Sequence, residues 1–175
     1  MNKLIYLVGA RASGKTTVGE RLARDLNLPC LDTDRRMGLR HGVSVAEVVE
    51  KLGWPGFRAL ESEILAEVST ESPAVVATGG GMVLAEANRR LMKDSGLVFY
   101  LSAPAEVLAE RMAQDPKSAQ RPSLTGRSPV EEVAQVLAER EELYRNAAHH
   151  VIDASADFEE EILAVKNIVK EAMKL

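Results

Sequence analysis

The chain has 175 residues, of which 46% are hydrophobic and 27% are charged, and its formal net charge is −4. This length fits one domain around a single core, and the acidic balance gives no electrostatic reason to expect binding to nucleic acid or to an anionic membrane surface. A lone cysteine, Cys30, excludes an internal disulfide framework and is typical of the reducing cytoplasm. No run approaches the roughly 18 apolar residues that span a bilayer, so we expect a cytoplasmic protein.

Short apolar runs alternate with segments of helical period along the whole chain. The expected strands are residues 4–8, 30–32, 74–77, 97–101 and 149–152. The expected helices are residues 15–26, 45–52, 55–68, 85–93, 105–112, 129–144 and 157–173. This alternation predicts a doubly wound α/β fold, with one five-stranded parallel sheet, helices on both faces and ligands at the carboxyl ends of the strands.

Local signals divide the chain further. Ser44 and Ser128 are each followed three residues later by Glu, which is the pattern of a capping box at a helix start. A Gly-Trp-Pro-Gly cluster at residues 53–56 separates two expected helices, and we interpret residues 33–61 as a small helical insertion. A polar stretch rich in Pro, Gly and Arg predicts a mobile lid at residues 112–127. The whole chain is then one domain.

The segment GARASGKT matches the phosphate-loop pattern G-x-x-x-x-G-K-[ST] and lies between the first expected strand and the first expected helix. Backbone N–H groups and a helix N-terminus would cradle a triphosphate, Lys15 would neutralise charge on its β- and γ-phosphates, and Thr16 would offer its hydroxyl to Mg²⁺. A Gly-rich turn that merely joins strand to helix is the alternative. The predicted ATP-binding residues of this segment are Gly9, Ala10, Arg11, Ala12, Ser13, Gly14, Lys15, Thr16 and Thr17.

Two acidic residues follow the second expected strand. On an extended segment the side chains of Asp32 and Asp34 would share one side. Asp32 would then reach the Mg²⁺ shell through water, and Asp34, one pleat further out, would accept or orient the proton of an attacking hydroxyl. The same residues suit equally well an Asx-turn or the N-cap of a helix at Arg35.

Three further features would together surround a small polar anion. Arg58 and Glu61 open an inserted helix, Thr78-Gly79-Gly80-Gly81 exposes backbone N–H groups after a strand, and Arg140 lies on the long helix before the last strand. Two arginines suit a carboxylate clamp, because the guanidinium group binds a carboxylate bidentately. Taken singly, Arg58 with Glu61 is a surface ion pair, Arg140 is a solvated charge, and the glycines form a structural turn.

With these motifs the chain resembles the shikimate kinases over nearly its whole length. The motifs that carry the resemblance are Gly9 to Thr16 followed by Thr17-Val18-Gly19, Asp32-Thr33-Asp34, Gly56-Phe57-Arg58 with Glu61, Thr78 to Gly81, Arg121-Pro122-Ser123-Leu124, and Leu143-Tyr144 behind Arg140. The resemblance implies a three-layer P-loop kinase fold. It also implies transfer of the γ-phosphoryl group of ATP to the 3-hydroxyl of shikimate, giving shikimate 3-phosphate and ADP in chorismate and aromatic amino acid biosynthesis. We expect a monomer whose partners are ATP and shikimate, with Mg²⁺ as the cofactor.

The same resemblance assigns the acceptor side of the site. Asp34 contacts the accepting hydroxyl, and Arg58 and Arg140 hold the shikimate carboxylate. Gly79, Gly80 and Gly81, together with Glu61, border the substrate. The catalytic residues implied in this way are Asp34, Lys15 and Arg121.

On the nucleotide side, the resemblance places Thr16 and Asp32 at magnesium. Arg121 would descend with the lid and neutralise charge on the phosphoryl group in transit. Arg111 and the loop from Asp153 to Ser155 would lie against the adenine. Ala12 departs from the family pattern, in which many members have glycine, and a positive φ there would strain an alanine by about 1 kcal/mol.

Two rival functions follow from the same residues. A related small-molecule or nucleoside monophosphate kinase would use its arginines on a second phosphate, but two clamps suit one carboxylate better. A catalytically silent sensor would normally lack Lys15 or Asp34, and both are present here.

Overall fold

The computed structural model describes residues 4–42, 44–115 and 123–173. One sheet of five parallel strands has the order β2-β3-β1-β4-β5. The strands are β1 (Leu4–Val8), β2 (Cys30–Asp32), β3 (Val75–Ala77), β4 (Gly96–Ser102) and β5 (His150–Asp153). Every strand end lies within one residue of its predicted position, so the predicted parallel sheet is confirmed.

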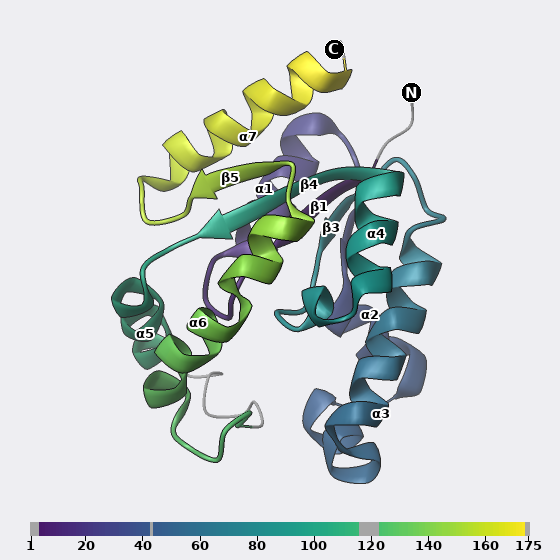
Figure 1. Ribbon diagram of the computed structural model, residues 1–175. Coiled ribbons are helices and arrows are strands. Elements are labelled where there is room, and N and C mark those ends of the chain that lie inside the picture. The colour runs from purple at the N-terminus through teal and green to yellow at the C-terminus, as the bar shows by residue number, and fades with distance from the viewer. Residues whose placement is uncertain (1–3, 43, 116–122, 174–175) are drawn as a thin grey trace.

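Helices cover both faces of the sheet (Figure 1). On one face α1 (Lys15–Leu26) contacts α7 (Phe158–Met173), and on the other α4 (Glu86–Ser95) contacts α6 (Pro129–Ala147). All residues of β1 are buried, because this strand is central and covered on both sides. The buried Tyr6 hydroxyl is still satisfied, since it lies 2.8 Å from the Ser69 and Ser95 hydroxyls.

The inserted lobe consists of α2 (Thr33–His41) and α3 (Val45–Val68). The two helices predicted at residues 45–52 and 55–68 are both present, and they join at a kink where Gly53 has a φ of 66°. Helix α2 was not among the predicted helices, because its sequence buries only Thr33 and Met37 and shows little apolar periodicity.

The remaining elements carry the lid and the strand-end loops. Helix α5 (Ala105–Gln114) packs against α6, and its last three residues, 112–114, belong to the predicted lid and are helical. A short 3₁₀ turn, η1 (Met82–Leu84), follows β3. Both predicted capping boxes are present, at Ser44 and at Ser128. Among the described residues, no helix has both the length and the apolar character needed to cross a membrane.

Candidate active site

The predicted phosphate loop connects the carboxyl end of β1 to the first turn of α1. Gly14 stands before α1 with a φ of 94°, a left-handed conformation that glycine adopts without strain. The Lys15 ammonium donates hydrogen bonds to the carbonyl oxygens of Gly9 and Ala10, at 2.9 and 2.7 Å. The loop therefore places a positive charge and the amino end of a helix at the edge of the sheet where ligands bind.

Ala12 lies in the same loop with a φ of 63°. An L-residue other than glycine pays about 1 kcal/mol for this left-handed conformation. Ala12 therefore has the positive φ at which strain was expected.

Asp32 has two separate roles at the end of β2. One carboxylate oxygen accepts a hydrogen bond from the Arg35 backbone N–H at 3.0 Å and caps α2, while the other accepts one from the Thr16 hydroxyl at 2.9 Å. The helix-cap interpretation is thus confirmed, and it is compatible with a metal-linked role. A hydroxyl and a carboxylate oxygen at this separation form a hard-oxygen donor pair of the kind that Mg²⁺ prefers.

Asp34 does not lie on an extended segment, so the expectation of one pleat beyond Asp32 was wrong. Because Asp32 caps α2, the backbone becomes helical at once and Asp34 falls in the first turn of that helix. A Cβ atom on Gly79 would lie 2.8 Å from an Asp34 carboxylate oxygen and 2.7 Å from one of Glu61. Glycine is needed there because two carboxylates approach its backbone closely.

Arg58, Glu61 and Arg140 meet beside Asp34. Arg58 pairs with Glu61, and its guanidinium carbon lies 5.2 Å from the Trp54 ring centroid and 5.1 Å from that of Phe57. The Glu61 side chain is only 2% exposed, so the surface-pair alternative is wrong. Burial raises the pKa of Glu61, while Arg58 and Arg140 act in the opposite direction.

The glycine loop after β3 is held by hydroxyl groups from two other elements. The Gly79 backbone N–H donates to the Thr33 hydroxyl at 3.0 Å, and the Tyr144 hydroxyl donates to the Gly80 carbonyl at 2.7 Å. Burial raises the pKa of Tyr144 to about 12, so this group remains a donor at neutral pH. Thr33 and Tyr144 are positioning residues that the sequence analysis quoted in motifs but did not assign.

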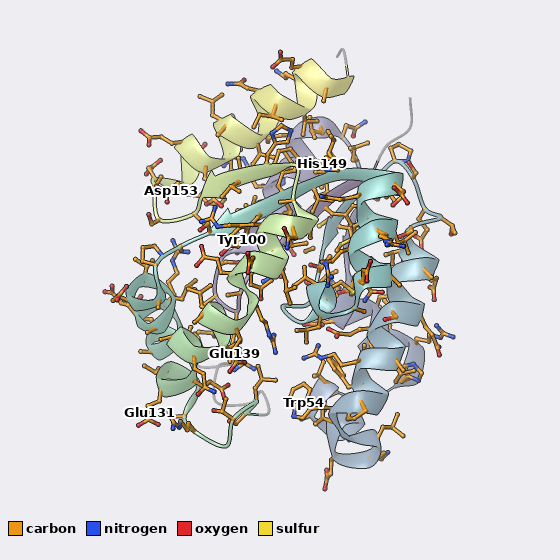
Figure 2. All side chains as sticks on the ribbon, in the orientation of Figure 1. Trp54, Tyr100, Glu131, Glu139, His149 and Asp153 are labelled. Carbon is orange, nitrogen blue, oxygen red and sulfur yellow. The ribbon has the colours of Figure 1, made fainter. Side chains whose placement is uncertain are left out.

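These groups line one cavity of about 360 Å³ at the carboxyl ends of the strands, between the α2–α3 lobe and the α5–α6 side (Figure 1). The predicted residues that line it are Arg11, Ala12, Gly14, Lys15, Thr16, Thr17, Asp32, Asp34, Arg58, Glu61, Gly79, Gly80, Gly81 and Arg140. Unassigned residues that also line it are Val45, Trp54, Phe57, Thr78, Met112, Asp115, Leu124, Val136 and Tyr144. Figure 2 shows Trp54 on the side of the lobe that faces α6.

A second cavity, of about 350 Å³, lies on the other side of the phosphate loop and is lined by Arg111 among others. Arg111 donates hydrogen bonds to the Ala12 and Ala154 carbonyls at 3.3 and 2.6 Å, which ties the loop to the turn after β5. Asp153 is among the lining residues of neither cavity. Its carboxylate accepts hydrogen bonds from the Ser155 N–H and hydroxyl in a local turn. Figure 2 labels this residue at the end of β5. Arg121 lies outside the described residues.

A phosphate loop on a parallel sheet, facing an inserted lobe with a carboxylate and arginines, defines a P-loop kinase of the small-molecule class. The family model described as shikimate kinase matches residues 11–172. The chain belongs to the shikimate kinase family, and it is an ATP-dependent kinase with shikimate as acceptor, acting in aromatic amino acid biosynthesis.

Relatives and solved structures agree with this assignment. The chain is 55% identical over 170 residues to shikimate kinase 2 of Syntrophotalea carbinolica, covering 97% of this chain and 98% of the relative. It is 56% identical over 155 residues to shikimate kinase 2 of Pectobacterium atrosepticum, covering 89% of each chain. The shikimate kinase of Acinetobacter baumannii, solved in complex with shikimate, has a TM-score of 0.86 at 33% identity, with coverage of 99% of this chain and 94% of that one.

Proposed function

We propose that phosphoryl transfer to the 3-hydroxyl of shikimate takes place in the cavity of about 360 Å³. The observation that carries the proposal is that Lys15, Asp34 and Arg140, from three separate elements, line this one cavity. The phosphate loop supplies the nucleotide side and the α2–α3 lobe supplies the acceptor side, so a phosphate and an alcohol would meet between them.

Asp34 is the group that orients the attacking hydroxyl. It lies at the close approach to Gly79, next to the buried Glu61, where a ring alcohol would have a carboxylate within reach. Acceptance of the hydroxyl proton by Asp34 would aim the oxygen in line with the γ-phosphate.

Arg58 and Arg140 hold the shikimate carboxylate. The Arg58 guanidinium is fixed in place by its pairing with Glu61 and by packing on Trp54 and Phe57. A cation fixed in this way loses little side-chain entropy when it binds a carboxylate. Glu61 is therefore a positioning residue rather than a ligand for the substrate.

Thr16 and Asp32 would hold Mg²⁺. Bound there with ATP, the ion would neutralise charge on the β- and γ-phosphates. The donor pair fits the ion, since both are hard oxygens and Mg²⁺ in kinases usually takes few protein ligands and several waters or phosphate oxygens.

We further propose residues 112–127 as the lid that closes over both substrates, with Arg121 entering the site. Closure would exclude water, which otherwise competes for the phosphoryl group. We propose Arg111 and the turn after Asp153 as the adenine side, although the Asp153 carboxylate is engaged within its own turn. We also propose a cytoplasmic monomer, and the lone cysteine supports the reducing compartment.

A coupled assay with ATP and Mg²⁺ tests the acceptor. We expect turnover with shikimate, and turnover that is much slower or absent with quinate and with nucleoside monophosphates. Preferred phosphorylation of a nucleoside monophosphate would contradict the proposal, because the arginines would then bind a phosphate instead of a carboxylate.

A further inference from the structure

Tyr144 lies on α6 one helical turn after Arg140, and both residues line the cavity of about 360 Å³. Residues at this spacing are neighbours on one face of a helix. Tyr144 is only 1% exposed, and its ring stacks on that of Tyr100, with the two ring centroids 5.1 Å apart. Packing in the core therefore fixes the ring of Tyr144 and, with it, the position of its hydroxyl group.

The single proton of the Tyr144 hydroxyl is already used, because it is donated to the Gly80 carbonyl oxygen at 2.7 Å. A hydroxyl group has one donor and two acceptor positions, so toward any other neighbour Tyr144 can only accept. Arg140 is such a neighbour, since its charge and its hydrogen bonding to the hydroxyl both oppose the rise that burial causes in the pKa of Tyr144. A guanidinium group only donates, so the two side chains are complementary.

Gly80 connects this hydroxyl to the phosphate loop. A Cβ atom on Gly80 would lie 3.5 Å from the Gly9 carbonyl oxygen and 3.7 Å from the Arg11 backbone nitrogen. The same atom would lie 3.7 Å from the Tyr144 hydroxyl oxygen. Gly80 is thus packed between the phosphate loop and Tyr144, and the position of the hydroxyl is tied to the loop that would hold the transferable phosphate.

The two arginines of the proposed clamp are held in different ways. Arg58 has a carboxylate partner, Glu61, and lies over two aromatic rings. The ion pairs found in the part of the chain that the structure describes do not include Arg140. A long side chain that is left mobile must be ordered when a ligand binds, and that ordering reduces affinity. A neutral hydroxyl can order Arg140 in advance without neutralising the charge that a ligand carboxylate needs.

We infer that Tyr144 is the positioning residue for Arg140: its hydroxyl, oriented by the Gly80 carbonyl, holds the Arg140 guanidinium in place before a carboxylate binds. This inference rests on the proposed carboxylate clamp. Because Gly80 is packed on the phosphate loop, the arrangement sets the place of the bound carboxylate relative to that loop. Loss of the hydroxyl should therefore weaken the binding of shikimate and leave the binding of nucleotide nearly unchanged.

The test is a double-mutant cycle between Tyr144→Phe and Arg140→Ala, with the Kd for shikimate as the readout. Trp54 is the only tryptophan of the chain and lines the same cavity, so its fluorescence reports shikimate binding without turnover. We expect Tyr144→Phe to raise this Kd by roughly fivefold or more in the natural chain, because a hydrogen bond to a charged group is lost. In the Arg140→Ala chain the same change should raise it by less than about twofold, since no guanidinium is left to position.

Tyr100→Phe is the matched control. Tyr100 is also 1% exposed and belongs to the same stack, but its hydroxyl interacts with Ser102 and the residue is not among those that line the cavity. This variant should change the Kd for shikimate by less than about twofold. In steady-state kinetics, Tyr144→Phe should raise the KM for shikimate and leave kcat and the KM for ATP within about threefold. Thermal unfolding of both variants shows whether the stack has loosened.

The outcomes separate this inference from the clamp on which it rests. An equal rise in Kd with and without Arg140 would overturn the inference, because the hydroxyl would then act by another route. An unchanged Kd in Tyr144→Phe, or a rise of the same size in Tyr100→Phe, would overturn it as well. If Arg140→Ala alone leaves the Kd for shikimate unchanged, the clamp is wrong and this inference falls with it.

Discussion

At the scale of single residues, the site depends on charges that are held rigid by their neighbours. Arg140 is one of these. Its positive charge lies close enough to oppose the rise that burial causes in the pKa of Glu61 and of Tyr144. Its helix carries a second arginine, Arg145, whose side chain is 52% exposed and pairs with Glu141. Both arginines lie on α6, but Arg140 lines the cavity and Arg145 does not, so a substitution of Arg145 is a matched control for one of Arg140.

We therefore expect Arg140→Ala to raise the KM for shikimate by roughly 30-fold or more, since a charge-assisted bidentate contact is lost, and to leave the KM for ATP nearly unchanged. Arg145→Ala should change neither constant by more than about twofold. Steady-state kinetics with each substrate varied in turn provide the check. Equal damage to both constants in Arg140→Ala would contradict the clamp.

Asp34→Asn keeps the size of the side chain and removes its capacity to accept a proton. We expect kcat to fall by roughly 10²-fold or more while ADP affinity stays within about twofold. Single-turnover kinetics and titration calorimetry measure the two quantities separately. Near-normal turnover would remove Asp34 from the chemistry.

The sequence predicted which of these residues gather at one cavity more readily than it predicted their backbone conformation and burial. Asp34 was selected from its spacing and lines the cavity, but its predicted extended conformation was wrong, because Asp32 caps α2 and the backbone becomes helical at that point. The burial of Glu161 was not predicted, because three glutamates occur in succession at residues 159–161. Only the phase of α7 against the sheet decides which of them is buried, and that phase depends on packing.

At the scale of elements, the carboxyl end of the proposed lid is anchored to α6 by one carboxylate. Glu132 accepts hydrogen bonds from the Ser123 hydroxyl at 2.9 Å, the Leu124 N–H at 3.0 Å, and the Thr125 N–H and hydroxyl at 2.9 and 2.8 Å. Although burial opposes ionisation, these bonds hold the pKa of Glu132 below its usual value. The residues 123–127 therefore have a fixed attachment from which a lid can move.

Glu132→Gln leaves one accepting oxygen but removes its negative charge, so the four hydrogen bonds to Oε2 lose their charge assistance and the attachment should weaken. We expect amide hydrogen exchange at residues 124–127 to quicken by roughly tenfold or more, and kcat to fall several-fold. Glu139→Gln, on the same helix but exposed, is the control. Exchange that stays at the natural rate in Glu132→Gln would show that the anchor lies elsewhere.

The strands were predictable at this scale and part of the lobe was not. Buried parallel strands leave continuous apolar runs, as in residues 4–8, whereas α2 is polar along most of its length. The Gly-Trp-Pro-Gly cluster predicted two separate helices. In the structure the two helices follow one another directly and are joined by a kink at Gly53. Short polar helices depend on caps and tertiary contacts that periodicity does not report.

At the scale of the whole molecule, Glu161 couples stability to pH. Its pKa of about 7 in the folded protein exceeds the ordinary 4.5, so the folded state binds more protons than the unfolded state between these values. Folding stability is therefore lost as the pH rises from about 4.5 to about 7 and stays reduced above that range. The cost reflects a charge forced into a buried position.

Glu161→Leu removes this cost. We expect its advantage in unfolding free energy over the natural chain to be larger at pH 8 than at pH 5 by about 1–3 kcal/mol. Urea unfolding at the two pH values measures the difference, and Glu160→Gln should show no such change. An advantage of equal size at both pH values would mean that Glu161 does not titrate in this range.

The central claim is that a nucleotide and a carboxylated ring alcohol occupy one cavity, with Asp34 at the alcohol. A crystal structure with a non-hydrolysable ATP analogue, Mg²⁺ and shikimate tests it most directly. The account predicts the shikimate carboxylate on Arg58 and Arg140, and the 3-hydroxyl within hydrogen-bonding distance of Asp34 and in line with the γ-phosphate. Shikimate bound outside the cavity, or with its carboxylate turned away from both arginines, would contradict it.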